Sequence, residues 1–377
     1  MWMSAEEALR RLRCKPQSLY ANVSRGRVRA KADPADQRRS LYSTEDIERL
    51  AARAHGRRPA RVVAAEAVNW GEPVFPSALS TVIGGRLSYR GLDAAELSRT
   101  ASLTDVAALL WGAQAVQLDS PLLAATPSVE TLFAELAFRA ATSPPVVSQA
   151  SASLVAAASE VLALAAAALA GPGLQPLHDR LAGLWRRPDG ADSIRRALVL
   201  LADHELNAST FAARVAVSTG ASLWAGTLAG LCALNGPRHG TAAREVRVLA
   251  EDLGGASAEA ELRDWLGEGR HVPGFGHRLY PHGDVRVPAL LDAFEEPAGF
   301  AAFRRAGESV TGELPNIDYA LAAMTARFDL PSSAPMTLFA LGRSVGWLAH
   351  MIEQIQSGQL IRPRAHYVGS APQYPQT

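Results

Sequence analysis

One segment of this chain places a histidine directly after proline and glycine residues: Pro273-Gly274-Phe275-Gly276-His277-Arg278. Proline and glycine interrupt helices, so this run predicts a loop. Glycine lets a ligand approach the backbone closely, and the histidine proton is easily tuned near neutral pH. The stretch therefore indicates a binding loop, and we interpret the other segments outward from it.

Segments on both sides of this loop also combine histidine, arginine or aspartate with proline or glycine. They are Ala202-Asp203-His204-Glu205, Gly236-Pro237-Arg238-His239-Gly240, Pro315-Asn316-Ile317-Asp318-Tyr319, Leu341-Gly342-Arg343-Ser344-Val345-Gly346-Trp347 and Leu360-Ile361-Arg362-Pro363-Arg364. Arginines spread over separate segments suit a ligand with several carboxylates, because each guanidinium can form a bidentate pair.

The chain around these segments is predicted to be helical. Breaks that contain proline or glycine separate the helices at residues 142–145, 171–173 and 187–190. Val82 to Tyr89 is the best candidate for a short hairpin, with its turn at Gly84-Gly85. Strands do not alternate with helices along the sequence, and no internal repeat is found, which argues against a parallel sheet. We expect an all-α fold.

The segments that contain histidine, arginine or aspartate resemble the motifs of the citrate synthase family, and they occur in the same order along the chain. The resemblance runs from Tyr89-Arg90-Gly91 to Tyr367-Val368-Gly369, although Ala113 to Asp192 matches only as generic helices. It implies a helical homodimer whose subunits each have a large and a small domain. The implied reaction condenses an acyl-CoA with oxaloacetate.

The resemblance also implies a role for each site residue. His239 would polarise the thioester carbonyl, Asp318 would remove the neighbouring proton, and His277 would hydrogen-bond the ketone of oxaloacetate. The carboxylate-binding residues would be His204, Arg286 and Arg343, together with Arg362, which reaches the neighbouring subunit's site. The loop that binds coenzyme A would contain Pro273, Gly274, Phe275, Gly276 and Arg278.

The chemistry independently explains this set of residues. A thioester α-proton is weakly acidic, so a carboxylate base needs simultaneous stabilisation of the developing oxyanion. Histidine donors and arginines supply that stabilisation, so we expect no metal and no permanently bound cofactor, with the coenzyme A thioester as a substrate. Each residue also has a simpler interpretation. His239 and Asp318 could be helix caps, and the three arginines could form surface ion pairs.

The sequence departs from the family pattern next to the expected catalytic residues. Thr241-Ala242-Ala243-Arg244 replaces the usual glycine, alanine, asparagine and glutamate, and Pro281 and Val285 replace a lysine and a proline. Tyr319-Ala320-Leu321-Ala322 replaces an aromatic-serine-glycine run after Asp318. These changes spare His239, His277 and Asp318, but they alter the surroundings of the site and of the coenzyme A phosphates.

The N-terminal segment differs from the rest in charge. Through Arg61 it has 15 Lys and Arg and 7 Asp and Glu, a net charge of +8, whereas the remainder carries −7. Such asymmetry indicates separate partners. Ser4 and Glu7 form a capping-box pattern at the start of a helical unit that extends to Ala54.

The elements expected in this unit resemble the winged helix-turn-helix of MerR and excisionase proteins. A second helix is expected from Gln17 to Val23, a wing or hairpin from Arg25 to Tyr42, and a third helix after Ser43. The resemblance implies DNA binding, and a unit that only packs against another part of the protein is the alternative. Phosphate contacts would come from Arg25, Arg27 and Arg29.

These observations predict the domains of the protein and its location in the cell. We expect a helix-turn-helix-like domain and linker at 1–61, a large helical domain at 62–236 and 326–377, and a small domain at 237–325. Met1 to Tyr20 lacks the apolar core of a signal peptide, and Ser151 to Ala170 fits a buried helix better than a membrane span. Two cysteines are too few for a disulfide framework, so a cytoplasmic location is expected.

Three functions remain open from the sequence. The first is a citrate synthase or a 2-methylcitrate synthase, which would use acetyl-CoA or propionyl-CoA. The second is a paralogue that needs a partner chain, because Arg362 would act across a dimer interface. The third is a DNA-binding regulator whose citrate synthase-like body senses a metabolite.

Overall fold

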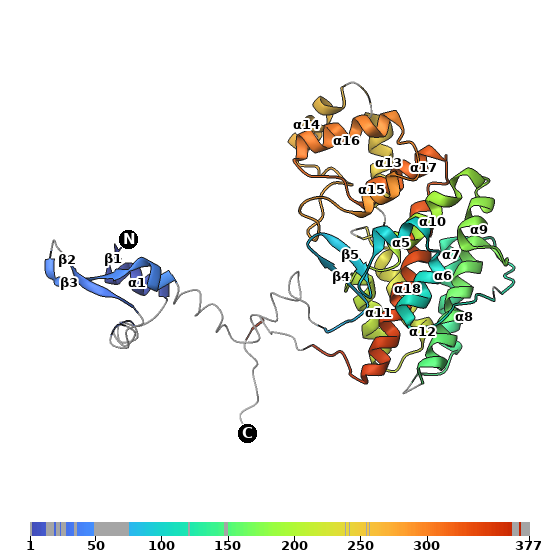
Figure 1. Cartoon of the computed structure of the whole chain (residues 1–377), viewed down its shortest axis with the longest axis horizontal. Helices are drawn as coiled ribbons and strands as arrows, with labels where there is room; N and C mark the ends of the chain where they lie inside the picture. The colour runs from blue at the N-terminus through green and yellow to red at the C-terminus, as the bar shows by residue number, and fades with distance from the viewer. Residues whose placement is uncertain are drawn as a thin grey trace. The chain divides into compact units, whose positions relative to one another are not determined.

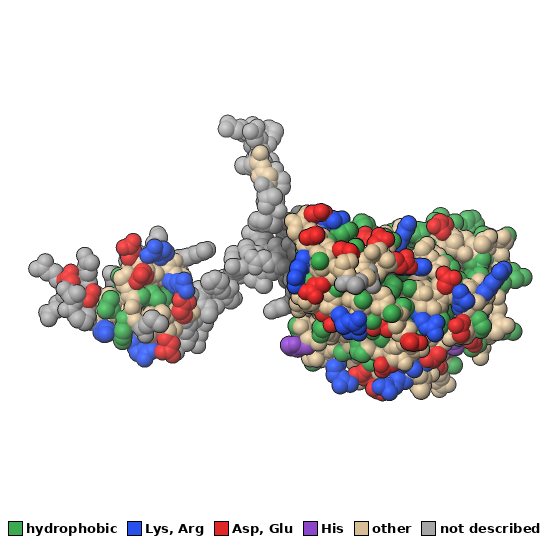
Figure 2. Space-filling model, turned by 90° about the horizontal axis from the view of Figure 1, so that it is seen from above, with side chains coloured by type: hydrophobic (Ala, Val, Ile, Leu, Met, Phe, Trp, Pro, Cys, Tyr) green, Lys and Arg blue, Asp and Glu red, His purple; other side chains and the backbone are tan. Residues whose placement is uncertain are grey.

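The computed structural model describes residues 2–12, 19, 23, 28–33, 36–48, 75–119, 121–146, 150–237, 239–240, 242–253, 255, 257–363 and 369–370. The chain forms two compact units (Figure 1). One comprises Met1–Pro76 with Pro363–Thr377, and the other comprises Ser77–Arg362. Acidic and basic side chains are intermixed on the visible face of each unit (Figure 2).

The N-terminal unit contains a three-stranded antiparallel sheet of order β1-β3-β2 beside helix α1. Its small core contains Ala8, Leu19, Val28, Tyr42 and Ile47. The element bounds are β1 Trp2–Met3, α1 Ala5–Leu12, β2 Ala30–Asp33 and β3 Asp36–Ser43.

Two local predictions for this unit are confirmed. The Ser4 amide donates to Glu7 Oε2 (3.0 Å) and the Glu7 amide donates to Ser4 Oγ (3.2 Å), which is the expected capping box. The expected hairpin is formed by β2 and β3. The predicted helix from Gln17 to Val23 lies outside the described residues except for Leu19 and Val23, as do Arg25 and Arg27.

The large unit begins with a second small sheet, β4 (Ser80–Ile83), β5 (Arg86–Tyr89) and β6 (Leu92–Asp93). Ile83 pairs with Arg86, so Gly84 and Gly85 form a two-residue turn. Both glycines have positive φ, +58° and +74°, which a tight hairpin turn requires and which glycine adopts without strain. The predicted hairpin and its turn are confirmed.

The rest of the large unit is helical, which confirms the predicted fold class. Helix α7 ends at Thr142, α8 ends before Gly171, and a 3-10 turn occupies Pro188–Gly190, so the predicted breaks are also confirmed. The helices are α5 Ala94–Thr100, α6 Leu103–Trp111, α7 Val129–Thr142, α8 Ser151–Ala170, α9 Leu177–Leu184, α10 Ala191–Leu201, α11 Ala208–Ser218, α12 Leu223–Leu234, α13 Ala242–Leu253, α14 Ala258–Gly267, α15 Arg286–Leu291, α16 Ala298–Thr311, α17 Ile317–Arg327 and α18 Ala334–Ser357.

Helix α18 runs through the middle of the large unit (red in Figure 1). It packs against α6, α8, α10, α11 and α12, and nearly all of its side chains from Ala334 to Ile352 are buried. A helix buried on all sides must satisfy its polar side chains inside the protein. The few polar residues of α18 are therefore structurally informative.

A second, smaller hydrophobic core lies among α13, α14, α16 and α17. It includes Val246, Leu262, Phe275, Phe303 and Tyr319. The loop around Phe275 belongs to this core, α10, α11 and α18 belong to the main core, and α17 contributes to both, with Ile317 in the main core and Tyr319 in the smaller one. The sequence segments singled out above therefore come from both cores.

Helix α8 is long and apolar enough to cross a membrane by length and composition. Twelve of its side chains are buried, from Leu154 to Ala170, and the helix packs against α7, α9 and α18. Its apolar composition is therefore explained by a position in the main core.

Candidate functional site

A cluster of aromatic and imidazole rings joins two of the predicted segments. His204 follows α10 and is buried, and its Nε2 lies 2.8 Å from the Tyr280 hydroxyl. The His277 ring is edge-on to the His204 ring with centroids 5.2 Å apart, and its centroid lies 4.9 Å from that of Tyr280. Tyr280 therefore brings the two histidines together.

The environment keeps both histidines neutral. Burial, followed by the positive charges of Arg286 and Arg343, lowers the pKa of His204 well below its usual value. Burial and Arg286 lower the pKa of His277 to about 4. A neutral imidazole can donate one hydrogen bond without bringing a charge into the site.

His239 is held by contacts from α11 and α18. Its Nε2 lies 2.9 Å from Ser209 Oγ, which also accepts a hydrogen bond from Trp347 Nε1 (3.1 Å). The single Ser209 hydroxyl proton can go to His239 Nε2 or to Asn207 Oδ1 (2.7 Å), and only in the first arrangement does His239 Nδ1 carry the donor proton. Burial, followed by Arg343, lowers the pKa of His239 to about 4. His239 is thus a neutral, oriented imidazole.

Asp318 is the second residue of α17, and its carboxyl is left without a partner. The side chain of Asn316 caps this helix by accepting from the Asp318 amide (3.1 Å), so Asp318 is not the cap itself. Asp318 Oδ1 is buried and has no hydrogen-bond partner among the described residues. Burial raises its pKa to about 7, although Arg286 opposes the shift. A buried carboxyl with these properties is a candidate general base.

Arg286 is buried and paired inside the protein. Its Nε and Nη2 donate to the two carboxylate oxygens of Asp284 (2.9 and 2.7 Å). Asp284 also accepts from the amide of Ile317 (3.1 Å), which links the start of α15 to the start of α17. Arg286 is therefore a fixed, buried cation, and the simpler interpretation as a surface ion pair is wrong for it.

Arg343 is equally buried, in the middle of α18. Its Nε donates to the carbonyl of Leu201 (2.9 Å), the last residue of α10. Among the described residues, its terminal amino groups form no hydrogen bond. Those groups remain available for an anionic ligand, because a buried guanidinium needs acceptors.

The loop from Pro273 to Gly276 is held by backbone bonds to the start of α17. The Asn316 amide donates to Gly274 O (2.9 Å), and the Gly276 amide donates to Leu314 O (2.8 Å). The Phe275 ring is buried near Phe303 and Tyr319, so a ligand at this loop would meet the Phe275 backbone rather than its ring.

The two remaining predicted site residues are exposed. Arg278 lies at the end of the same loop. Arg362 is exposed beside Ile361, whose amide donates to Ser218 Oγ (3.2 Å) at the end of α11. Within the described residues of this single chain, Arg362 forms no ion pair.

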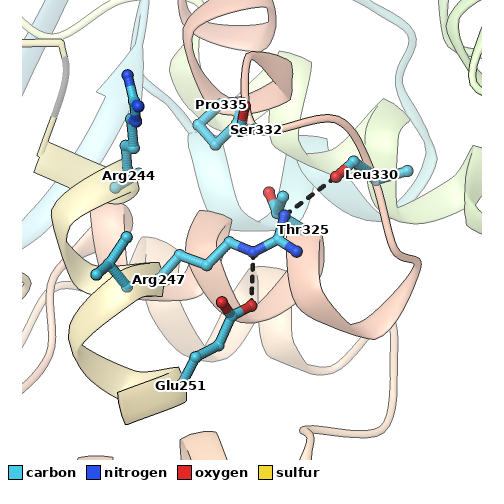
Figure 3. A pocket seen from close by; sticks show the side chains of 9 residues that line it. Arg244, Arg247, Glu251, Thr325, Leu330, Ser332 and Pro335 are labelled. Atoms are coloured by element: carbon cyan, nitrogen blue, oxygen red, sulfur yellow. Dashed lines mark hydrogen bonds and ion pairs between the residues drawn. The ribbon is translucent and has the colours of Figure 1, made fainter.

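The departure at Arg244 lies beside a hollow of about 340 Å³ formed by α13, α17 and the start of α18 (Figure 3). Arg247 crosses this hollow, and it donates to Glu251 Oε1 (2.7 Å) and to Leu330 O (3.1 Å). Arg244 lines the hollow one helical turn before Arg247. The added charge noted in the sequence is thus accommodated at a solvent-accessible surface.

Sequence reasoning missed the residues that support the site. The sequence motifs imply no role for Tyr280, Ser209 or Trp347, and they favour a structural role for His350. The spacing of Arg343, Trp347 and His350 along α18 is a signal that could have found them, because residues three or four apart share one helix face.

Comparisons with known proteins agree with this architecture. A crystal structure of citrate synthase from Thermotoga maritima matches with a TM-score of 0.67 and 25% identity, covering 81% of this chain and 96% of that one. A ternary complex of carboxymethyl coenzyme A and oxaloacetate with citrate synthase from Thermoplasma acidophilum matches the fold with a TM-score of 0.66 and 23% identity, with the same coverage.

Curated relatives match over a shorter length. Citrate synthase 2 of Bacillus subtilis is 36% identical over 220 residues, which are 52% of this chain and 59% of that protein. The 2-methylcitrate synthase of Mycobacterium tuberculosis is 37% identical over 190 residues, 47% of this chain and 48% of that protein. The chain thus spans about half the length of the curated relatives that it matches.

The family model for the C-terminal domain of citrate synthase matches residues 125–364. This match covers more than half of the chain, and it includes the segments that carry His204, His239, His277, Asp318 and Arg343. The protein therefore belongs to the citrate synthase family.

Proposed function

We propose that the protein condenses an acyl-CoA with oxaloacetate and releases free coenzyme A. The observation that carries this proposal is the Asp318 carboxyl, whose Oδ1 is buried without a partner among the described residues and whose pKa is raised to about 7. Such a carboxylate is a stronger base than an exposed aspartate and is half ionised near neutral pH. The neutral histidines and buried arginines around it suit a dicarboxylate and a developing oxyanion.

In the proposed reaction, each site residue has one role. Asp318 takes a proton from the carbon next to the thioester carbonyl, while His239 donates a hydrogen bond to the carbonyl oxygen and stabilises the resulting enolate. The enolate carbon attacks the ketone carbon of oxaloacetate, and His277 gives its proton to the ketone oxygen. Water then hydrolyses the thioester, so coenzyme A leaves as a thiol and a new carboxylate remains on the product. The substrate carboxylates bind to His204, Arg286 and Arg343.

The acyl group is acetyl or propionyl, which gives citrate or 2-methylcitrate. The matched relatives include proteins named for each activity. One methylene changes binding by only about 1–3 kcal/mol through pocket shape, so relatives at this level of identity do not separate the two substrates.

A steady-state assay of thiol release tests the proposal directly. The purified protein is expected to release free coenzyme A from acetyl-CoA or propionyl-CoA only when oxaloacetate is present. Omitting oxaloacetate is the control for simple thioester hydrolysis. No release with either acyl-CoA would contradict the proposal and favour a regulator or a paralogue that needs a partner chain, neither of which the comparisons favour.

The enzyme acts as a homodimer with a site shared between subunits. Arg362 supports this part of the proposal, because it is exposed in the single chain and matches the family arginine that crosses the interface. Mixing an Arg362→Ala chain with an Asp318→Ala chain should restore about a quarter of the activity, since half of the random dimers have one intact site. Each variant alone is the control. No restoration after proven subunit exchange would contradict the shared site.

The N-terminal unit binds duplex DNA and resides with the enzyme in the cytoplasm. Its charge of +8 through Arg61 supports this view, as does the β2–β3 hairpin. Arg29 is a weaker candidate for phosphate contact than Arg25 or Arg27, because its guanidinium pairs with Asp46 (2.7 Å) and Glu45 (3.0 Å).

Salt dependence of DNA binding tests this second function. Affinity for duplex DNA should fall steeply as salt increases, and Arg25→Ala with Arg27→Ala should reduce the slope by about 2 on a log–log scale. Arg86→Ala, an exposed change in the large unit, serves as the control. The absence of any duplex retention at low salt would remove this function without affecting the synthase.

A further inference from the structure

A buried chain of charged residues lies against the loop that carries His204. His350 of α18 is fully buried between Asp203 and Arg214, and Arg214 in turn pairs with Glu353. These residues come from three separate parts of the chain: the loop after α10, the middle of α11 and the C-terminal half of α18. Buried charges are expensive to bring together, so their arrangement calls for a physical explanation.

The donors and acceptors determine the state of His350. Arg214 Nη1 lies 3.0 Å from His350 Nδ1, and arginine can only donate, so Nδ1 accepts and carries no proton. His350 Nε2 lies 3.1 Å from Asp203 Oδ2, and a carboxylate can only accept, so Nε2 carries the proton. His350 is therefore a neutral imidazole in a single tautomer, held at both nitrogens.

Asp203 connects this chain to the expected substrate site. It immediately precedes His204, and its Oδ2 also accepts from Ser80 Oγ of β4. Burial alone would raise the pKa of Asp203, but the interaction with His350, the charge of Arg343 and the Ser80 bond together lower it. Asp203 is thus an ionised carboxylate beside the Arg343 guanidinium.

The same loop is fixed at every neighbouring residue. The Leu201 carbonyl accepts from Arg343 Nε (2.9 Å), and the Ala202 carbonyl accepts from the Gly346 amide (3.0 Å). Glu205 has a positive φ of +53°, and its side chain accepts from the Val82 amide (2.6 Å). A strained non-glycine residue persists only where its surroundings over-determine it.

We propose that Asp203, His350, Arg214 and Glu353 form a positioning network that holds His204 and Arg343 in register to bind the dicarboxylate substrate. None of the four is a catalytic residue. The inference rests on the proposed function for the identity of the ligand. The hydrogen bonds of the network are donated in one direction, from Arg214 to His350 and from His350 to Asp203. The bond from Arg214 to His350 Nδ1 strengthens the His350 Nε2–H donor, and that donor orients Asp203.

Two substitutions at His350 separate hydrogen bonding from shape. His350→Gln keeps an amide donor for Asp203 and a carbonyl acceptor for Arg214, whereas His350→Leu removes both. His350→Leu should weaken oxaloacetate binding, measured by calorimetry without acyl-CoA, by about 10-fold to 100-fold, the range for losing hydrogen bonds to charged groups. His350→Gln should stay within about threefold of wild type, and the KM for acyl-CoA should change by less than about twofold in either variant.

The control is His178→Leu in α9, a partly buried histidine elsewhere in the large unit. It should leave oxaloacetate binding unchanged. Equal losses in His350→Leu and His350→Gln would overturn the proposal, because shape alone would then explain them. An increase in the KM for acyl-CoA as large as the loss of oxaloacetate binding would also overturn it.

Histidine NMR provides a readout that needs neither activity nor a variant that folds poorly. In wild-type protein labelled with ¹⁵N-histidine, the His350 signal, assigned by its loss in His350→Gln, should show a protonated Nε2 and an unprotonated Nδ1 at neutral pH. An imidazolium or the opposite tautomer would overturn the network. If the tautomer is as expected and oxaloacetate does not bind to wild type, the proposed function fails and the network is only structural.

Discussion

Asp203 is fully buried and Asp318 is partly buried with its Oδ1 enclosed, yet the pKa values of these two aspartates of the large unit shift in opposite directions. Asp203 accepts from His350 and Ser80 and lies near Arg343, and these interactions outweigh burial. Oδ1 of either aspartate lacks a hydrogen-bond partner among the described residues, so the difference lies at Asp203 Oδ2; no described residue donates to the Asp318 carboxyl, and burial dominates there. The difference teaches that hydrogen-bond partners, more than depth, separate a carboxylate that organises structure from one that is available for proton transfer.

The largest effect is expected from removing Asp318, the proposed catalytic base. Asp318→Ala should lower turnover by about 10²–10⁴, the usual contribution of a positioned acid or base. Oxaloacetate binding, measured by calorimetry, should stay close to wild type, because within the described part of the chain the Asp318 side chain forms no hydrogen bond to the carboxylate-binding residues. Asp329→Ala, an exposed change after α17, is the control. Undiminished turnover in Asp318→Ala would remove it as the base.

Replacing Asp203 by a neutral residue should lower the stability of the protein. Asp203→Asn should lower the free energy of unfolding by about 1.5–3 kcal/mol at pH 7, because it removes the charged acceptor of the hydrogen bonds from His350 and Ser80. Urea unfolding measures the effect, with the half-exposed Asp179→Asn as the matched control. The Asp203 pKa is lowered in the folded state, so this contribution is lost as the pH falls through that lowered value. Unchanged stability at pH 7 would contradict the ionised state of Asp203.

Asp318→Asn should have the opposite effect on the free energy of unfolding from Asp203→Asn. The folded pKa of about 7 exceeds the unfolded value of about 3.9, so ionised Asp318 costs stability as the pH rises through 7. Asp318→Asn should therefore be more stable than wild type at pH 8, by at most about 4 kcal/mol, and equal to it near pH 3. Thermal unfolding at both pH values checks this. A destabilised Asp318→Asn at pH 8 would show that the carboxylate has an unrecognised partner.

Gly346 of α18 tests how closely this helix packs against Asp203. A Cβ at Gly346 would clash with Asp203 Oδ1 and the Ala202 carbonyl, so Gly346→Ala should cost about 1–3 kcal/mol of stability. Gly183→Ala in α9 is the control, because nothing lies within 4 Å of its Cβ position. That control should be neutral or stabilising by up to about 1 kcal/mol. Equal stability of the two variants in urea unfolding would contradict the close approach at Gly346.

The features predicted correctly from the sequence are mostly local. The Ser4–Glu7 capping box, the Gly84-Gly85 turn and the helix ends before Ser143 and Gly171 all depend on residues within a few positions of each other. The all-α class followed from the same signals. The resemblance to a family then ordered the site segments, which the structure describes around His204 and Tyr280.

The features that the sequence did not reveal are the partners of charged side chains. Arg29 was expected to contact phosphate, yet it pairs with Asp46, 17 residues away. The sequence favours a structural role for His350, and it does not reveal the contact with Asp203, which spans 147 positions. No spacing rule relates residues that far apart, since their contact depends on how α10, α11 and α18 pack.

By itself, the sequence determined the helical elements, their ends and the types of residue available for chemistry, because caps, turns and breaks are short-range interactions. The tertiary structure alone decided which aspartate is ionised and which is held near neutral pH. Asp203 and Asp318 are the same residue type, and only long-range packing gives Asp203 Oδ2 its His350 and Ser80 partners, whereas no described residue donates to the Asp318 carboxyl. Burial and charge act through space, so their effect on a pKa is set by the fold rather than by neighbours in the sequence.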